Sequence, residues 1–165
     1  MIEYTVRVTP YSTHWMLNGE LHREDGPAID DASRFKAWYV NGKCHREDGP
    51  AIEFANGDKS WFVNGKRHRT DGPAVEHTDG DKEWFVNGER HRENGPAIEE
   101  NGYKEWYLNG ELHRTDGPAV IYKSGETEWW LNGTKVTEAE VMSPTKEMTM
   151  AELEAILGHK LKVIK

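Results

Sequence analysis

A phrase repeated six times constrains this chain more than any other feature. In the clearest copy, residues 61–74 read W-F-V-N-G-K-R-H-R-T-D-G-P-A, and the general form is W-[FYMW]-[VL]-N-G-x-x-H-R-x-[DN]-G-P-A-[IV]. The opening tryptophans are Trp15, Trp38, Trp61, Trp84, Trp106 and Trp129, spaced 23 residues apart with one step of 22. A fixed period of this length predicts a repeat array in which neighbouring units share one core.

Each repeat reads as two strands separated by turn signals. Residues 73–77 form the first expected strand, a turn containing Gly80 follows, and residues 82–86 lead into Asn87-Gly88. Asn-Gly is typical of a type I′ hairpin turn, because both central residues need φ > 0. Neighbouring strands lie about 4.8 Å apart, so six two-stranded units predict a sheet on the order of 55 Å long. We expect a mainly β fold, a single elongated twisted antiparallel sheet of β-hairpin repeats.

The segments outside the repeats read as caps. Residues 1–9 alternate between apolar and polar side chains, which predicts a half-buried strand covering the first sheet edge. At the other end, Thr137 and Glu140 form a capping box, a second box begins at Thr149, and residues 160–165 read as a strand. We therefore divide the chain into an N-terminal capping strand (1–14), six repeats (15–136) and a short α+β C-terminal cap (137–165).

Composition narrows the classes of partner and compartment. The net charge of −8 disfavours nucleic acid and anionic membranes as partners. A single cysteine gives no disulfide framework and fits a reducing compartment. The sequence shows no secretory signal and no apolar run long enough to span a membrane, so we expect a cytoplasmic protein without a membrane partner.

A ladder of His-Arg pairs is the most chemically suggestive element. Its candidate ligand-binding residues are Arg23, Arg46, Arg69, Arg92 and Arg114, with His45, His68 and His91. A shared metal is disfavoured on geometry, because zinc needs nitrogens about 2.0–2.1 Å away and equivalent histidines recur roughly every 9.5 Å. Catalysis is disfavoured too: the kinase-like His-Arg-x-Asp phrase has no Gly-rich phosphate loop beside it, and active sites are not built five times over. We expect no catalytic residue, metal or cofactor.

Two interpretations of the ladder stay open. The arginines could form a stripe that binds phosphates, since a guanidinium donates two parallel hydrogen bonds to such groups. Alternatively, His and Arg bond loop carbonyls and neighbouring carboxylates, and fix the crossover between units. The residue before Gly-Pro is Asp in four copies and Asn94 in one, which favours a turn-forming role for that position over a charged one.

The aromatic residue that follows each Trp raises a second question. Neighbours along a strand point to opposite faces, so Trp61 and Phe62 cannot share one. One ring of each pair then belongs to the core, and the other lines the opposite face. Phe62, Phe85 and Tyr107 are therefore candidate binding residues on an aromatic ridge. The alternative is that a second layer or a homo-oligomer buries both faces.

The repeat resembles the MORN family, whose hairpin units also run 23 residues. The G-x-x-H element matches at residues 65–68 and 88–91, Gly80 matches the later turn, and Trp84 lies near the family's aromatic position. The likeness covers residues 15–133 and departs after the His, where this chain has Arg in place of Gly. It implies a MORN-like solenoid. The whole pattern is also similar to repeat proteins of bacteria and their phages, which implies a scaffold or binding role with no fixed chemistry.

We therefore expect a non-enzymatic scaffold that binds another protein through its sheet surface. The resemblance to phage proteins implies a sharper form: a phage-encoded inhibitor or sequestering protein that acts on a bacterial host or defence factor in the host cytoplasm. The alternative function is binding of an anion, a nucleotide or a nucleic acid by the His-Arg ladder.

Overall fold

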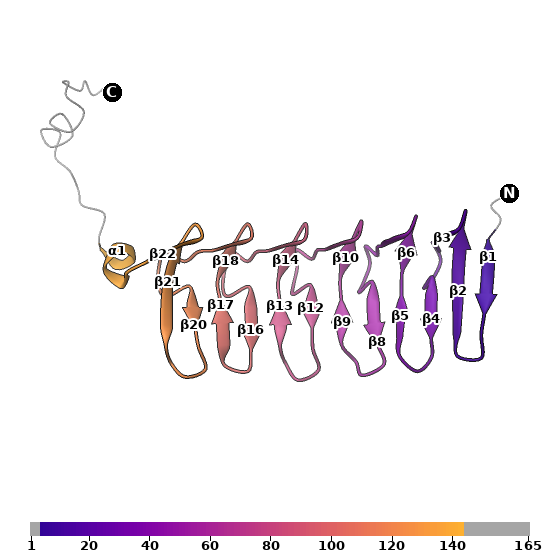
Figure 1. Ribbon diagram of the computed structural model, residues 1–165, viewed down its shortest axis with the longest axis horizontal. Coiled ribbons are helices and arrows are strands. Elements are labelled where there is room, and N and C mark those ends of the chain that lie inside the picture. Colours follow the sequence, from indigo (N-terminus) through magenta and orange to yellow (C-terminus); the bar gives the residue numbers. More distant parts are fainter. Residues whose placement is uncertain (1–3, 144–165) are drawn as a thin grey trace, which may run out of the picture.

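The structure is a computed structural model that describes residues 4–143. It is one long row of antiparallel hairpins, with the N-terminal strand at one end and helix α1 (Glu138–Met142) at the other (Figure 1). The predicted mainly β array of hairpin repeats is confirmed. No helix in the described range is long and apolar enough to cross a membrane.

The main sheet has 14 strands, of which 13 follow one another across the sheet in chain order, while the short strand Glu20–Leu21 lies off this path. These strands are β1 (Thr5–Val8), β2 (Ser12–Leu17), β3 (Glu20–Leu21), β4 (Ile29–Asp31), β5 (Phe35–Ala37), β8 (Ile52–Phe54), β9 (Lys59–Ser60), β12 (Val75–Glu76), β13 (Lys82–Glu83), β16 (Ile98–Glu100), β17 (Tyr103–Glu105), β20 (Val120–Ile121), β21 (Thr127–Leu131) and β22 (Thr134–Val136). Each hairpin pairs with the next, so the units share one continuous backbone ladder.

A second row of smaller hairpins stands along one edge of this sheet (Figure 1). Its strands are β6 (Tyr39–Val40), β7 (Lys43–Cys44), β10 (Phe62–Val63), β11 (Lys66–Arg67), β14 (Phe85–Val86), β15 (Glu89–Arg90), β18 (Tyr107–Leu108) and β19 (Glu111–Leu112). Each turns at Asn-Gly, and φ is 51° at Asn64 and 80° at Gly65. The predicted type I′ turn is confirmed.

In the second to fifth repeats, the Trp marks the boundary between the two rows. We expected one strand over residues 82–86, but it is broken at Trp84 into β13 and β14. The Trp84 N–H donates to the carbonyl of Ala97 in the main sheet (2.8 Å), while its carbonyl accepts from His91 in the small hairpin (3.1 Å). The chain changes hydrogen-bonding partners at this residue, so each of these four repeats contributes two hairpins and not one.

Small hairpins of neighbouring repeats also bond to one another. Gly88 N–H donates to the carbonyl of Arg67 (2.8 Å), and Arg69 N–H donates to the carbonyl of Phe85 (3.0 Å). The same two bonds recur at every junction from the first repeat to the sixth. Each unit is therefore tied to the next by its main-sheet strands and by its small hairpin.

The turns of the main sheet explain the single 22-residue step. In the second repeat, Phe54 and Asp58 close a three-residue loop in which Gly57 has φ 96°. This is the loop type in which a left-handed Gly follows a type I turn. In the fourth repeat, the loop shrinks to Asn101-Gly102, with φ 37° and 88°. The missing residue is lost from a turn, so the register of the sheet is kept.

The core is thin and runs the length of the array. The alanine of each Gly-Pro-Ala phrase has no exposed surface; these residues are Ala28, Ala51, Ala74, Ala97 and Ala119. Ala74, Val75 and Phe85 form a buried cluster against which Trp61 packs. A methyl group is the largest side chain that such a close contact between neighbouring units admits.

The N-terminal strand is more exposed than the sequence predicts, whereas the predicted capping box at the C-terminal end is present. Strand β1 pairs with β2, and Tyr4 packs edge-on against Trp15 at 5.9 Å. Val6 and Val8, expected on a half-buried face, are 41% and 70% exposed, because no further unit covers them within the described residues. At the other end, the capping box of Thr137 and Glu140 is present. The second helix and the strand expected beyond residue 148 lie outside the described residues.

Candidate binding surface

The guanidinium group of each His-Arg pair lies within the joint between the two hairpins of a repeat. Arg69 Cζ is 4.1 Å from the ring centre of Trp61, which is a cation–π contact. On the other side, a Cβ placed on Gly72 would come within 2.8 Å of the same Cζ. The guanidinium is thus held between the indole and the Gly-Pro backbone. The same stack recurs at Arg23–Trp15 (4.3 Å), Arg46–Trp38 (4.1 Å), Arg92–Trp84 (3.7 Å) and Arg114–Trp106 (4.0 Å).

Hydrogen bonds occupy most of this guanidinium. Arg69 Nε donates to Asp71 Oδ1 (2.9 Å), and Nη1 donates to the carbonyl of Pro73 (3.1 Å) and to Glu76 Oε1 (2.8 Å). The hydrogen bond and the positive charge of Arg69 hold the pKa of Asp71 below its usual value. The bond to the Pro carbonyl is made in all five copies.

The carboxylate before Gly-Pro is an ion-pair partner of the Arg. The contact between Arg Nε and this Asp is present in the four copies that have Asp, namely Asp25, Asp48, Asp71 and Asp116. Asn94 makes no such bond within the described residues, and Arg92 pairs there with Glu99 (2.8 Å). The sequence comparison predicted only a turn role for this position, but in four copies the Asp also pairs with the Arg. Asn94 can replace the Asp because Arg92 keeps its other two acceptors, the Pro96 carbonyl and Glu99.

The histidine of each pair joins neighbouring repeats. His68 Nδ1 accepts a hydrogen bond from the backbone N–H of Asn87, at 3.0 Å. The same bond links His22 to Asn41, His45 to Asn64, His91 to Asn109 and His113 to Asn132. Each His thus fixes the Asn-Gly turn of the following unit.

These contacts place the predicted ladder inside the scaffold. The five arginines have only 21–28% of their side chains exposed, and their donors are directed to internal acceptors. A phosphate stripe requires free, accessible N–H groups. The sequence carried a signal for this role, since Asp or Asn recurs two residues after each Arg.

The aromatic residue after each Trp lies on the other side of the array. Phe85 packs on Val75 and is 8% exposed, whereas Trp84 stacks on Arg92. The predicted residues Phe62 and Tyr107 are half-buried at equivalent places. Cross-strand partners of this row sit five residues later, as at Phe62↔Arg67, Phe85↔Arg90 and Tyr107↔Leu112.

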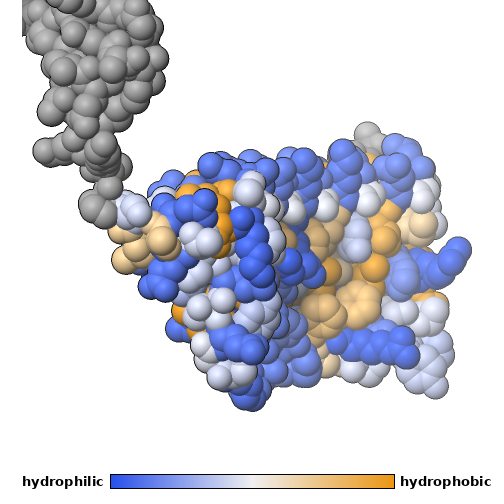
Figure 2. All heavy atoms as spheres, turned by 60° about the vertical axis from the view of Figure 1, so that its left-hand side comes forward, coloured by the Kyte–Doolittle hydropathy of each residue, from blue (hydrophilic) through white to orange (hydrophobic). Residues whose placement is uncertain are grey.

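We call this side of the array the variable face, because its side chains differ from repeat to repeat. It comprises the second and seventh positions of each repeat, counted from Trp, and the main-sheet side chains on the same side. Phe35 and Phe54 belong to it and lie 6.3 Å apart, centre to centre. Figure 2 shows hydrophobic residues gathered in a hollow below the Asn-Gly turns, in the part of the array remote from α1.

Toward α1 the variable face carries ion pairs. Arg90 Nη2 donates to Glu83 Oε2 (3.2 Å), and its Cζ is 5.5 Å from the ring centre of Tyr107. Lys135 Nζ donates to Glu128 Oε1 (2.7 Å). Sequence reasoning did not single out these residues, nor Phe35 and Phe54. The available signal was a Glu seven residues before a basic residue across an Asn-Gly turn, a spacing that the hairpin brings face to face.

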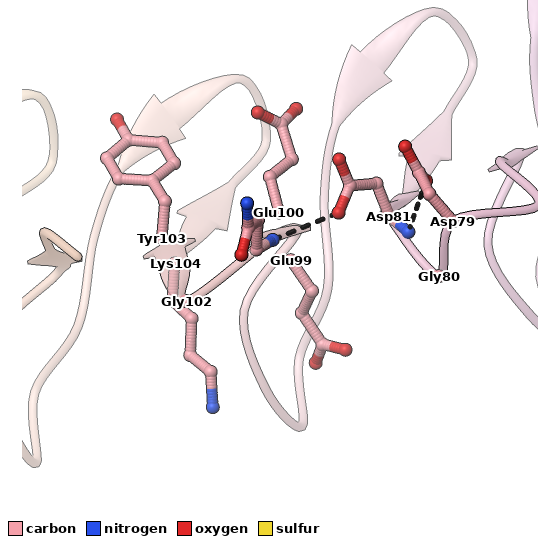
Figure 3. Close-up of a pocket in the computed structure, with 9 residues that line it drawn as sticks. Asp79, Gly80, Asp81, Glu99, Glu100, Gly102, Tyr103 and Lys104 are labelled. Atoms are coloured by element: carbon pink, nitrogen blue, oxygen red, sulfur yellow. Dashed lines mark hydrogen bonds between the residues drawn. The ribbon is translucent and has the colours of Figure 1, made fainter.

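A hollow at the turns lies between the third and fourth repeats, where a longer turn stands beside the shortened one (Figure 3). Asn101 N–H donates to Asp81 Oδ1 (2.9 Å), and Asp81 N–H donates to Asp79 Oδ1 (3.1 Å). The carboxylates of Glu99 and Glu100 point in opposite directions. Across residues 4–143, no three His, Cys, Asp or Glu side chains are grouped so as to hold a metal ion.

Comparison with known proteins returned nothing: no family model, no curated protein and no solved structure matches this chain. The resemblance to MORN repeats therefore stays a prediction. What the geometry provides is a scaffold with two unlike sides, one held together by Trp and Arg and the other lined by side chains that change along the array.

Proposed function

We propose that this chain is a non-enzymatic scaffold that binds another protein along its variable face. The observation that carries the proposal is that some positions of the repeat hold the array together while others face away from these contacts. The unvarying Trp, Asn and Gly, and the recurring His and Arg, bond within the array or stack on one another. The second and seventh positions, which vary, line the opposite side.

The chemistry of the variable face suits a protein partner. Phe54 is 41% exposed next to Phe35, and aromatic side chains of this kind supply much of the energy of protein interfaces. Large apolar side chains left partly open on one continuous surface are typical of interaction sites. The hollow in Figure 2 adds a concave shape to that surface.

The alternative, an anion or nucleic-acid binder, is less well supported. Its arginines donate to Asp, Glu and Pro acceptors of the same repeat, and the chain carries a net charge of −8. A polyanion would have to displace these contacts against an unfavourable field. The narrower expectation of a phage-encoded inhibitor rests on the resemblance alone and stays a prediction.

Affinity capture with matched variants tests the proposal. The full chain, Phe54→Glu and Lys36→Gln would each be immobilised and exposed to bacterial lysate. Lys36 is exposed and directly follows Phe35 in β5, so it points to the other side of the sheet. We expect one stoichiometric partner that the parent and K36Q retain and F54E loses. The proposal fails if no stoichiometric partner is captured, or if F54E retains the partner as well as K36Q does.

A further inference from the structure

One basic residue of the variable face departs from the pairing rule that its neighbours follow. Arg90 pairs with Glu83 and Lys135 pairs with Glu128, in each case a carboxylate seven residues earlier. Seven residues before Arg67 the chain has Ser60, which is only 6% exposed. Within the described residues, Arg67 makes no ion pair and no side-chain hydrogen bond. Among the basic residues at the seventh position of the repeat, Arg67 is therefore the one whose charge no carboxylate of the described residues neutralises.

Arg67 lies beside a hollow between two aromatic rings. Its Cζ is 5.2 Å from the ring centre of Phe85. The hollow is lined by Phe62, Phe85, Lys66, Arg67 and Glu89, with the backbone of the Asn-Gly turn between them. The site thus offers the half-buried ring of Phe62, the small exposed part of the Phe85 ring (8% exposed) at its floor, and a guanidinium with free donors. Other repeats lack this combination, because their seventh position is apolar or already paired.

We propose that this hollow binds a protein segment that presents an apolar side chain next to a carboxylate. The apolar side chain fits between Phe62 and Phe85, and the carboxylate accepts two parallel hydrogen bonds from the Arg67 guanidinium. Such bidentate pairs are among the stronger polar contacts in proteins. Packing against a ring shields the pair partly from water, which strengthens it. The inference rests on the proposed function and specifies the chemistry of its partner.

The charges around the hollow also favour one position of the partner segment along the array. The chain carries a net charge of −8, so an acidic segment is repelled along most of its length. Lys66 and Arg67 are adjacent cations at the hollow, and Glu89 is the one acid that lines it. An acidic residue of the partner is therefore favoured at this place and disfavoured elsewhere.

A nucleic-acid strand uses similar groups, since bases stack on aromatic rings and phosphates pair with Arg. Its affinity depends on many phosphate contacts made together. Here a single Arg and a single Lys are set in an acidic molecule, so a short acidic protein segment fits the site better. The experiment separates the two.

The test uses a capped peptide with the core Leu-Phe-Glu-Leu, a matched peptide with Gln in place of Glu, and a short oligothymidylate. Binding to the full chain would be followed by amide chemical shifts. We expect the Glu peptide to move the signals of residues 62–67 and 85–89. The Gln peptide should bind about 10-fold more weakly, the usual effect of losing a hydrogen bond to a charged group.

Two substitutions change the pairing of Arg67 and of Arg90 without removing either arginine. Ser60→Glu supplies the carboxylate that the later repeats have, so it should neutralise Arg67 and weaken the Glu peptide about 10-fold. Glu83 occupies the equivalent place in the next repeat, since Ser60 pairs with Val75 as Glu83 pairs with Ile98. Conversely, Glu83→Ser frees Arg90 between Phe85 and Tyr107, and should create a second site.

Several results would overturn the inference. These are equal affinity for the Glu and Gln peptides, binding that S60E leaves unchanged, or tighter binding of the oligothymidylate at Arg67. Dispersed amide spectra for S60E and E83S would show that each variant folds. If the captured partner depends on Phe54 but not on Ser60→Glu, the proposed function stands and this inference falls.

Discussion

Arg69 and Trp61 are eight residues apart in the chain and lie face to face, with 4.1 Å between the guanidinium carbon and the ring centre of the indole. The contact joins the start of the small hairpin to its exit, where the chain re-enters the main sheet. Because it recurs in five units, the array is stabilised by a stack that each repeat supplies for itself. Four experiments follow from this stack and from contacts around it.

Removing the space that the guanidinium occupies should loosen the repeat. Gly72→Ala would place a Cβ 2.8 Å from Arg69 Cζ, and the Arg must then leave the indole. We expect a loss of about 1–3 kcal/mol in the free energy of unfolding, the usual cost of overpacking, measured by urea denaturation. In an Arg69→Ala background the same change should cost far less. An equal cost in both backgrounds would show that Gly72 is needed for another reason.

The histidine bridge predicts a local effect at the next repeat. His68→Ala removes the acceptor of the Asn87 N–H. We expect a loss of about 1 kcal/mol, typical for one hydrogen bond, and faster hydrogen exchange at the Asn87 amide. His14→Ala is the control, because His14 makes no side-chain hydrogen bond to another described residue. If the Asn87 amide exchanges at its original rate in H68A, the bridge does not protect that turn.

An ion pair between two turns predicts a pH dependence. His77 Nδ1 lies 2.9 Å from Asp58 Oδ2; this hydrogen bond raises the pKa of His77 and lowers that of Asp58. A raised His pKa stabilises the fold below the unfolded value of about 6.5 and ceases to do so as pH rises through the folded value. A lowered Asp pKa stabilises above the unfolded value of about 3.9 and is lost as pH falls through the folded value.

The pair therefore contributes most between about pH 4 and pH 6.5. We expect His77→Gln to lower Tm more at pH 5.5 than at pH 8.5, as measured by differential scanning calorimetry. Other titrating groups are common to both proteins and cancel in the difference. A Tm difference that is the same at both pH values would mean that protonation of His77 adds nothing to stability.

The single cysteine predicts slow thiol chemistry. Cys44 is 9% exposed, and burial raises its pKa to about 12. The thiolate is the reactive form, so a disulfide reagent at pH 8 should label the folded chain about a thousandfold more slowly than the urea-unfolded chain. Labelling of both forms at the same rate would show that the first small hairpins open readily.

Sequence alone determined the period, the hairpin units and the turn chemistry, because these depend on local rules. The Asn-Gly that follows the Trp phrase forms a type I′ turn with positive φ at two successive residues, and all six copies adopt it. The single shortened repeat could also be found by counting. The Trp, Asn and Gly that never vary were identified as structural for the same reason.

Only the tertiary structure decided where each chain segment changes its hydrogen-bonding partner and which side chains make their contacts inside the array. The break at Trp84 depends on bonds to Ala97 and His91, which lie in different hairpins, and no local pattern specifies both. Likewise, Arg67 and Arg90 look alike in the sequence. They differ because the hairpin sets Glu83 beside one and Ser60 in the equivalent position for the other, and contacts across a turn exist only once the chain has folded back on itself.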